Sequence, residues 1–416
     1  MNNIKQKSEY CLNCKLKPCS LKGCPLNNDI PTFIKQIKEE KYVDAFNTLT
    51  NTTVLSAICG RICPHKKQCE GSCVRGVKGT SVCIGELEAF VGDYAIKNNL
   101  KISSEVSTKL NKTKVAVIGG GPAGLTCSAY LAKKGIDVTI YEKYSFLGGL
   151  LMYGIPDFRL SKDIVKNTID KILELGINVK YNQKLGENLK LEELIKKYDY
   201  IVLTFGANIS TKMGIDGENI AGVYGGNELL ESKNHPDYKG KTVIINGGGN
   251  VAMDTARTIK RLGAESVKIV YRRSKEQMPA EEKEINDAKN EGIEFLFQNN
   301  IVKINGTNKV ESVELIKTKL VKKEGDERLS PVNIEGSNYT IKTDYIVMAL
   351  GSKTDILVEK LGLDLDNKKN IKINDRYQTS NPKIYAGGDV RGGYKTVAWA
   401  ARDGRNIAEE ILKNIT

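Results

Sequence analysis

The cysteines are the residues of this chain whose type and spacing point most directly to chemistry. The sequence has ten cysteines in 416 residues, and nine of them lie between positions 11 and 83. One group has the spacing C-x2-C-x4-C-x4-C, and a second has the spacing C-x3-C-x5-C-x3-C. The groups are Cys11, Cys14, Cys19 and Cys24, and Cys59, Cys63, Cys69 and Cys73. Thiolates gathered in this way bind soft metal ions or metal clusters, so the segment is expected to hold metal.

Zinc, disulfides and iron–sulfur clusters are the three candidate uses of these cysteines. Zinc sites usually show two C-x2-C pairs, or paired cysteine and histidine, whereas here only Cys11 and Cys14 form such a pair. Disulfides are disfavoured because the polar N-terminus lacks a signal-peptide profile, which predicts a reducing, cytoplasmic location. Ferredoxin-type runs end in Cys-Pro, and in this chain Cys24 and Cys63 are each followed by a proline. The spacing therefore favours iron–sulfur clusters over zinc.

A glycine-rich turn follows an apolar run within residues 114–142, KVAVIGGGPAGLTCSAYLAKKGIDVTIYE. The G-x-G-x-x-G glycines allow a tight turn, the approach of the backbone to a pyrophosphate, and close packing of the helix on the strand. Glu142 ends the next strand, where an acid can accept hydrogen bonds from ribose hydroxyls. A chance glycine turn is the alternative, but the complete pattern favours a dinucleotide site. Its residues are Gly119, Gly121, Pro122, Ala123, Gly124 and Glu142.

A second fingerprint lies within residues 241–273, KTVIINGGGNVAMDTARTIKRLGAESVKIVYRR. Its second strand ends in Arg272 and Arg273 instead of an acid, and a guanidinium pair there suits the 2′-phosphate of NADP. The alternative is two solvated arginines after a strand. The turn and helix residues of this site are Gly247, Gly249, Asn250, Val251 and Ala252.

These motifs require particular elements to position them. Each fingerprint reads as strand, turn, amphipathic helix and second strand, which is a βαβ unit. Strands are also expected at 345–350 and within 383–390, with a final helix from about 396 to 412. Residues 31–50 space their apolar side chains as one helical face would, and the polar residues 101–112 read as a linker. Two Rossmann units with a return segment predict one nucleotide domain inserted into another.

The composition excludes some classes of function. There are 63 basic and 50 acidic residues, a net charge of +13, which either attracts anionic partners or describes a solvated lysine-rich surface. No nucleic-acid-binding module is recognisable, and no apolar run approaches the length of a membrane span. Neither nucleic acid nor a membrane is therefore expected as a partner.

The C-terminal AGGDV (386–390) resembles the second FAD signature of flavoproteins with two dinucleotide domains. That resemblance implies that Asp389, after Gly388, binds the ribityl or phosphate region of FAD, and that the amides of Thr396 and Val397 face the flavin. Gly148 and Gly149 match a glycine pair that this family places under FAD.

The runs CLNCKLKPCSLKGCPLNNDIP and AICGRICPHKKQCEGSCVRG, followed by these motifs, resemble the small subunit of NADPH-dependent glutamate synthase. They are similar also to a subunit of NADH-dependent ferredoxin:NADP oxidoreductase and to the N-terminal half of dihydropyrimidine dehydrogenase. The resemblance implies two 4Fe–4S clusters, one held by Cys11, Cys14, Cys19 and Cys73. The other would be held by Cys24, Cys63, Cys69 and Glu88. The count of cysteines alone also allows Cys59 as the eighth ligand.

The expected fold is α/β: a helical iron–sulfur domain (1–110), an FAD-binding domain (111–225 and 341–416) and an inserted NADP-binding domain (226–340). The resemblance implies a hydride transfer from NADPH to FAD and single-electron transfer through two clusters to a partner subunit. The alternatives are a standalone NADPH flavin reductase, or diaphorase, with a structural metal domain, and a non-catalytic redox-sensing partner that binds nucleotides.

Overall fold

A computed structural model describes residues 2–105, 112–322 and 329–415 and divides the chain into two compact units. Unit 1 is Met1–Ala207 with Ile356–Thr416, and unit 2 is Asn208–Asp355. The chain thus leaves unit 1, builds unit 2 and returns, which confirms an inserted domain. Unit 2 begins before residue 226 and ends after residue 340, the positions expected from the sequence. The expected boundary at 110/111 lies outside the described residues, as does most of the expected linker.

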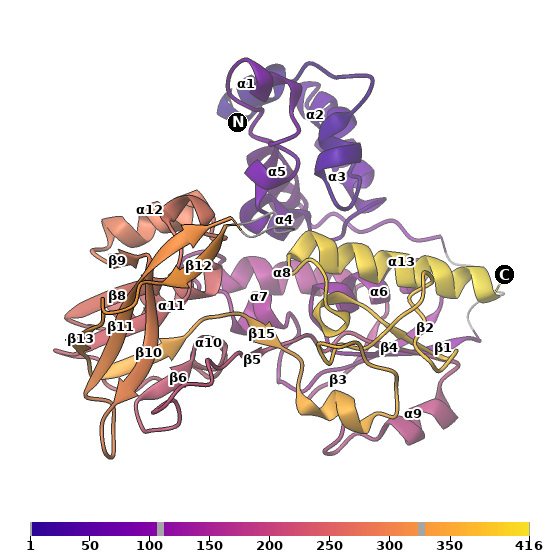
Figure 1. The fold of residues 1–416 in the computed structure, drawn as a ribbon. Coiled ribbons are helices and arrows are strands. Elements are labelled where there is room, and N and C mark those ends of the chain that lie inside the picture. Colours follow the sequence, from indigo (N-terminus) through magenta and orange to yellow (C-terminus); the bar gives the residue numbers. More distant parts are fainter. Residues whose placement is uncertain (1, 106–111, 323–328, 416) are drawn as a thin grey trace. The chain divides into compact units, whose positions relative to one another are not determined.

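The first hundred residues are helices connected by the cysteine-bearing loops (Figure 1). The α-helices are α1 (Asn2–Glu9), α2 (Ile30–Lys38), α3 (Tyr42–Thr50), α4 (Ser56–Ile62) and α5 (Ile84–Lys97). Short helical turns cover Cys19–Gly23, His65–Lys67 and Val74–Val77. The single helical face expected within 31–50 is wrong, because Glu40 has φ +60° and separates α2 from α3. Val43 is accordingly 47% exposed, while Phe33 and Phe46 are buried.

Unit 1 contains a parallel sheet with the strand order β16-β4-β1-β2-β3. Its strands are β1 (Lys114–Ile118), β2 (Asp137–Tyr141), β3 (Asn178–Lys180), β4 (Tyr200–Leu203) and β16 (Ile384–Ala386). The helices are α6 (Pro122–Ala132), α7 (Leu150–Tyr153), α8 (Lys162–Leu173), α9 (Leu191–Lys197) and α13 (Val397–Ile415). Strand β1, helix α6 and strand β2 form the βαβ unit that the first fingerprint predicts, and α13 ends three residues beyond the expected position.

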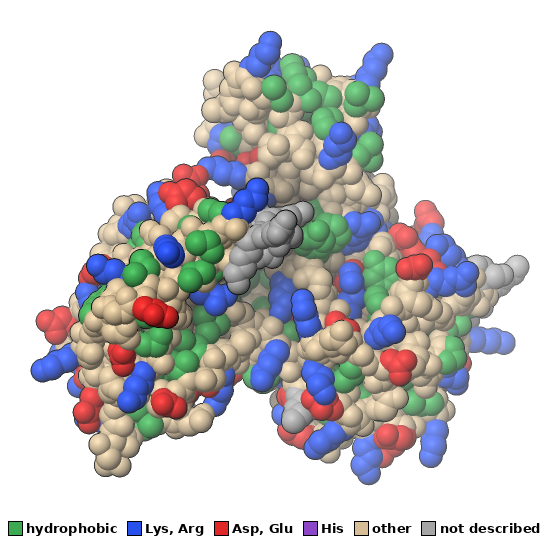
Figure 2. Space-filling view, viewed as in Figure 1, with side chains coloured by type: hydrophobic (Ala, Val, Ile, Leu, Met, Phe, Trp, Pro, Cys, Tyr) green, Lys and Arg blue, Asp and Glu red, His purple; other side chains and the backbone are tan. Residues whose placement is uncertain are grey.

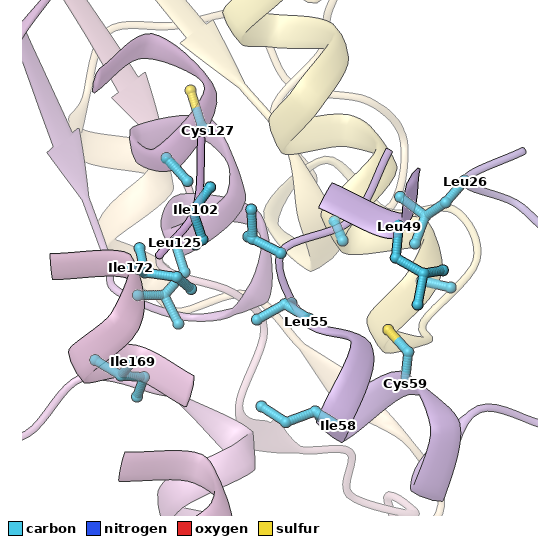
Figure 3. Close-up of a cluster of buried hydrophobic side chains, with 14 of the residues drawn as sticks. Leu26, Leu49, Leu55, Ile58, Cys59, Ile102, Leu125, Cys127, Ile169 and Ile172 are labelled. Atoms are coloured by element: carbon cyan, nitrogen blue, oxygen red, sulfur yellow. The ribbon is translucent and has the colours of Figure 1, made fainter. Parts of the chain in front are cut away.

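One hydrophobic core joins the cysteine-bearing helices to this sheet domain. Figure 3 shows Leu55 and Ile58 of the α4 region near Leu125 of α6 and near Ile169 and Ile172 of α8. All five side chains are at most 5% exposed. Because buried apolar area stabilises a fold roughly in proportion to its size, this shared core fixes the helices against the sheet domain.

Unit 2 has its own core around a second parallel sheet with the order β6-β14-β7-β8-β9. These strands are β6 (Val223–Gly225), β7 (Thr242–Asn246), β8 (Ser266–Tyr271), β9 (Glu294–Phe297) and β14 (Tyr345–Met348), with helices α10 (Gly226–Ser232), α11 (Asn250–Arg261) and α12 (Glu282–Asn290). A separate antiparallel sheet comprises β10 (Asn299–Asn305), β11 (Ser312–Val321), β12 (Ser330–Asn333) and β13 (Tyr339–Lys342). Strands β5 (Ile209–Ser210) and β15 (Ser352–Lys353) form a short pair. The βαβ order of β7, α11 and β8 matches the second fingerprint.

Helices in the described part of the chain all fall short of the length and apolar character that a bilayer crossing requires.

Candidate functional site

Four cysteines from distant parts of the N-terminal sequence line one cavity of about 350 Å³, a volume that includes its open mouth. This first thiol set is Cys11, Cys14, Cys19 and Cys73. Burial is the main cause that raises the pKa of the Cys19 thiol, to about 11, and the charges of Cys11 and Cys73 raise it further. Thiols that oppose one another's ionisation in this way are close together. The structure therefore gathers the four cysteines that the family resemblance assigns to one cluster.

A second thiol set surrounds a buried carboxyl group. Glu88, on α5, is 5% exposed, and burial raises its pKa to about 8. The Glu88 charge in turn contributes to the raised pKa of the thiols of Cys24, Cys63 and Cys69, in each case together with burial. The four residues predicted to hold the second cluster therefore lie within electrostatic range of one another.

Cys59 belongs to the same neighbourhood. It lies on α4, is 1% exposed, and hydrogen-bonds the Cys63 thiol, which is the largest cause of the raised pKa of Cys63. The charge of Cys59 also raises the pKa of Cys24. Both candidates for the eighth ligand, Glu88 and Cys59, are thus placed beside the other three donors.

The chemistry of these donors suits iron–sulfur clusters. Burial raises the pKa of the Cys11 and Cys24 thiols as well, the latter to about 12, so several thiolates would not coexist here without cations. Bound iron would replace the thiol protons and neutralise the thiolates. Among the described residues, no three His, Cys, Asp or Glu side chains are arranged to hold a single metal ion. The first set lines one cavity, so its four thiols face a common space.

Three residues that the sequence did not single out connect the second thiol set to α13. The Asn28 amide donates to Glu88 Oε1 at 3.2 Å, and the Thr52 hydroxyl donates to Asn28 Oδ1 at 2.7 Å. Arg405 of α13 donates through Nη1 to the Leu26 carbonyl at 2.8 Å and to the Thr52 carbonyl at 3.0 Å. Neither Arg405 nor Asn28 has a local signal in the sequence that predicts these contacts.

The first fingerprint loop has the conformation that dinucleotide binding requires. Gly119 has φ +100°, and a Cβ there would lie 2.6 Å from Cα of Phe205. A Cβ on Gly124 would lie 2.0 Å from the Gly119 carbonyl oxygen, so only glycine lets α6 begin this close to β1. Gly121 faces open space, with no atom within 4 Å of a Cβ, and is followed by Pro122 at the start of α6. A pyrophosphate could approach the backbone at that position.

Glu142 lies beside this loop, and its carboxylate accepts from two backbone amides. Its Oε2 accepts from the Gly120 amide at 2.8 Å, and its Oε1 accepts from the Tyr144 amide at 3.0 Å. The predicted glycine pair is close by: the Gly148 amide donates to the Gly120 carbonyl at 2.7 Å, and a Cβ on Gly149 would lie 3.1 Å from Cα of Gly121. The structure thus brings together the residues predicted around the first dinucleotide.

The C-terminal signature packs against the same helix. A Cβ on Gly388 would lie 3.2 Å from Cβ of Ala123, which places the signature at the start of α6. Burial raises the pKa of Asp389, and Asp403 raises it further. Asp403, which the sequence analysis missed, accepts from the Gly388 amide at 2.8 Å and from Nε of Arg391 at 2.7 Å. It therefore fixes the loop that carries Asp389.

Helix α13 starts within the predicted flavin-facing pair. The Thr396 hydroxyl accepts from the Trp399 amide at 3.4 Å, and Val397 is the first helical residue. A Cβ on Gly404 would lie 2.1 Å from the Ala123 carbonyl oxygen, so α13 and α6 are in close contact. The starts of α6 and α13 therefore lie near the first fingerprint loop and the C-terminal signature.

The second fingerprint lies in unit 2 with an equivalent geometry. Gly247 has φ +146°, and a Cβ there would lie 2.2 Å from the Ala349 carbonyl oxygen, whereas the nearest atom to a Cβ on Gly249 is at 4.0 Å. Asn250 and Val251 start α11, and Ala252 is fully buried on it.

The two arginines of this site differ in their surroundings. Arg272 is exposed at the end of β8, and its carbonyl accepts from the Thr318 hydroxyl at 2.8 Å. Arg273 donates through Nε to the Leu329 carbonyl at 3.2 Å. The Arg272 guanidinium is therefore open to an anion, while Arg273 is partly held by the protein.

Two family models match nearly the whole chain. Residues 113–404 match the pyridine nucleotide-disulphide oxidoreductase family, and residues 1–100 match domain II of dihydropyrimidine dehydrogenase, described as holding a 4Fe–4S cluster. The boundary between the two matched segments falls between the N-terminal helices and the first strand of the sheet domain. They support an FAD- and NADP-binding oxidoreductase fold preceded by a 4Fe–4S domain.

Individual proteins agree with the family models. The small chain of glutamate synthase (NADPH) from Escherichia coli is 33% identical over 98% of this chain and 90% of its own length. The beta subunit of NADP⁺-dependent formate dehydrogenase from Moorella thermoacetica is 32% identical over 95% of this chain and 59% of its length. Mycobacterium tuberculosis FprA, solved with NADPH, shares the fold with a TM-score of 0.65 at 21% identity, covering 73% of this chain and 84% of FprA. The chain therefore belongs to the pyridine nucleotide-disulphide oxidoreductase family and, within it, to the glutamate synthase small-chain group with an N-terminal 4Fe–4S domain.

Proposed function

We propose that this protein oxidises NADPH in unit 2, holds FAD in unit 1, and delivers single electrons through two 4Fe–4S clusters to a partner. One observation carries the proposal: two thiol sets gather in a helical domain that shares its core with the flavin-type fold. The shared core keeps the thiol sets at a fixed position relative to the first fingerprint. When bound, FAD accepts a hydride and releases electrons one at a time, and 4Fe–4S clusters carry single electrons.

The chain's residues bind and orient these groups. The open backbone at Gly121 and the start of α6 would bind the FAD pyrophosphate, and Glu142 would accept from the adenosine ribose. Asp389 would contact the ribityl or phosphate region, in a loop fixed by Asp403. The amides of Thr396 and Val397 would face the flavin ring, and Gly148 and Gly149 would lie beneath the cofactor.

In unit 2 the residues select the coenzyme. Gly249 leaves its backbone open, and the start of α11 at Asn250 would face the NADPH pyrophosphate. The guanidinium groups of Arg272 and Arg273 would bind the 2′-phosphate.

The first thiol set would hold one cluster, and Cys24, Cys63 and Cys69 would hold the other. Glu88 is the proposed eighth ligand because its buried carboxyl acts on all three of these thiols. Cys59 is the alternative, since its thiol hydrogen-bonds the Cys63 thiol.

A partner subunit is proposed as the electron acceptor. Glutamate synthase relatives are named as small chains, and the formate dehydrogenase relative is named as a beta subunit. The chain spans about nine tenths of the length of the former relatives.

The purified protein should contain about eight irons and eight acid-labile sulfides per chain, together with FAD. Under anaerobic conditions, NADPH should bleach the flavin absorbance and then part of the cluster absorbance band at about 400 nm. Flavin reduction without iron would favour the standalone flavin reductase. Binding of NADPH without any bleaching would favour the redox sensor.

The coenzyme assignment is tested by replacing Arg272 and Arg273 with alanine. The KM for NADPH should rise about tenfold or more, while the KM for NADH should change little, because only NADPH carries the 2′-phosphate. Equal losses for both coenzymes would contradict the role given to the arginines.

A further inference from the structure

The segment that follows β8 folds back onto the second fingerprint turn. Residues 272–281 connect β8 to α12 and carry both arginines of the proposed NADP site, and we call them the coenzyme loop. At the end of this loop the Ala280 amide donates to the Gly248 carbonyl at 3.1 Å. The Glu281 amide donates to Oδ1 of Asn250 at 3.0 Å. The coenzyme loop is therefore closed against the turn proposed to bind the pyrophosphate.

Tyr271 connects the coenzyme loop to the fingerprint turn. It is the last residue of β8 and is 8% exposed. A Cβ on Gly248 would lie 2.6 Å from its ring, so the ring packs directly against the turn. Its hydroxyl group donates to the Gln277 carbonyl at 2.7 Å, within a short helical turn (Lys275–Gln277) in the middle of the loop. One side chain thus contacts both the fingerprint turn and the coenzyme loop.

Both ends of the coenzyme loop are held by other contacts. The Arg272 carbonyl accepts from the Thr318 hydroxyl at 2.8 Å, and the Arg273 carbonyl accepts from the Gln298 amide at 3.1 Å. Further along, Met278 is 7% exposed and belongs to the core of unit 2. Between these points the loop turns through exposed residues, and the tyrosine hydroxyl supports that turn.

The position of the two guanidinium groups matters more here than a general positive charge. Figure 2 shows basic and acidic side chains interspersed over the visible face of unit 2, so no broad field of one sign covers this face. A guanidinium group binds a phosphate through directed hydrogen bonds of about 2.7–2.9 Å. Selection of a 2′-phosphate therefore depends on where the coenzyme loop holds its arginines.

We propose that Tyr271 is a positioning residue for coenzyme selection, which holds the coenzyme loop in the shape that presents Arg272 and Arg273 to the 2′-phosphate. The inference rests on the proposed function, which assigns NADPH to unit 2. A loop that is already ordered loses little conformational entropy when its ligand binds, so it binds more tightly than a loop that must first be ordered. A ligand without the 2′-phosphate gains nothing from this order.

The test is the affinity of the holoenzyme for two nucleotide fragments, measured by titration calorimetry with FAD bound in unit 1. Adenosine 2′,5′-bisphosphate carries the 2′-phosphate, whereas adenosine 5′-monophosphate does not. Tyr271→Phe keeps the ring against Gly248 and removes the hydroxyl bond, so the bisphosphate should bind about three- to tenfold more weakly. The monophosphate should bind as it does to the wild type.

Tyr345→Phe is the matched control. Tyr345 also lies in unit 2, and its hydroxyl group donates to a backbone carbonyl, that of Asp237, at 3.4 Å. It pairs with Val243 at the amino end of the sheet, whereas Tyr271 ends β8 at the carboxyl end. This variant should therefore bind both fragments as the wild type does.

A double-mutant cycle shows whether Tyr271 acts through the arginines. In a protein that carries Arg272→Ala and Arg273→Ala, Tyr271→Phe should cause no further loss of bisphosphate affinity, because the groups that it positions are gone. Losses that add in full would overturn the proposal, because Tyr271 would then act independently of the arginines.

Hydrogen exchange of the protein without ligand gives a second readout. Peptides that span the coenzyme loop should exchange faster in Tyr271→Phe than in the wild type or in Tyr345→Phe, because the loop opens more often. Weaker bisphosphate binding with unchanged exchange in the loop would also overturn the positioning role.

The wild type separates this proposal from the proposed function. If it binds the bisphosphate no more tightly than the monophosphate, the assignment of NADPH to unit 2 fails, and the positioning role fails with it. If the wild type prefers the bisphosphate and Tyr271→Phe keeps that preference in full, only the positioning role is overturned.

Discussion

Glu88 is an acid placed among thiols at a depth where carboxylates are seldom found. Its pKa is raised to about 8 by burial, and the Asn28 amide donates a hydrogen bond to its carboxyl group. A buried, protonated carboxyl beside three cysteines has little value as packing, but it becomes a good ligand once iron neutralises its charge. The residue-scale question is therefore whether iron is bound by Glu88 or by Cys59.

Replacement of each candidate separately answers this question. Glu88→Ala should remove about half of the iron, since one of two clusters loses a ligand. Cys59→Ala should keep the full iron content, and Glu88→Gln should keep most of it, because an amide oxygen can still bind. Iron analysis and the EPR spectrum of the reduced protein are the measurements. Iron loss in Cys59→Ala but not in Glu88→Ala would assign the ligand to Cys59.

Removal of the clusters should expose the titration of Glu88. The apo-protein's Glu88 has a folded pKa near 8 against about 4.5 in the unfolded chain, so the folded state binds the proton more tightly between these values. Its stabilising contribution is complete below about pH 4.5 and is lost as the pH rises through 8. Urea denaturation of apo-protein at pH 6 and at pH 8.5 should show this loss, and Glu88→Gln should reduce it. The same change in the free energy of unfolding between these two pH values in wild type and in Glu88→Gln would refute this effect.

The glycines of the first fingerprint should separate cofactor binding from folding. In Gly121→Ala the new methyl group meets no protein atom within 4 Å, so the fold should be kept while FAD is lost, because the methyl group occupies the place of the pyrophosphate. In Gly124→Ala the methyl group would lie 2.0 Å from a carbonyl oxygen, so thermal stability should fall as well. Bound FAD and Tm measure the two effects. Retention of FAD by Gly121→Ala would argue against this binding position.

At the scale of elements, α13 connects two sites that are far apart in the sequence. Its first residue, Val397, belongs to the pair proposed to face the flavin, Gly404 brings the helix into contact with α6, and Arg405 reaches the loops of Leu26 and Thr52. Because Thr52 donates to Asn28, and Asn28 donates to Glu88, the helix supports the second thiol set from the flavin side. The helix therefore supports residues of both proposed cofactor sites.

Arg405→Met should test this support. The substitution keeps much of the side-chain volume but leaves two carbonyl oxygens without their charged donor, which should lower the free energy of unfolding by about 1–3 kcal/mol. Lys413→Met, on the same helix, removes a 68% exposed charge and should change it by less than about 0.5 kcal/mol. Chemical denaturation of both variants measures the difference. Equal effects would show that the Arg405 contacts contribute little.

The sequence predicted those elements whose signal is local. The fingerprints at Gly119 and Gly247 carry their turn, helix and strand in about thirty consecutive residues, so the βαβ units could be expected without tertiary information. Asp403 and Asn28 could not, because each acts through a partner that only the folded chain brings near. The break at Glu40 was missed because helical spacing continues across it while the backbone takes φ +60°.

At the scale of the whole molecule, the thiol sets and the first fingerprint belong to one unit and share a hydrophobic core, while the second fingerprint belongs to the other unit. The N-terminal helices should therefore unfold together with the first sheet domain. Hydrogen exchange followed by mass spectrometry across a urea series should give one midpoint for peptides of α4, α5, α6 and α8. Peptides of α11 and β8 serve as the comparison from unit 2. Separate midpoints for α4 and α6 would show that the core does not couple them.

The shared core also has a consequence for protein engineering and for gene fusion. A cut near residue 105 would leave the apolar faces of α4 and α8 without partners, so each fragment would tend to aggregate. A designer who wishes to transplant the electron-delivering part to another enzyme should therefore move the helical segment and the first sheet domain together. Recombination during evolution would face the same constraint, and the inserted unit 2, with its own core, is the more exchangeable part.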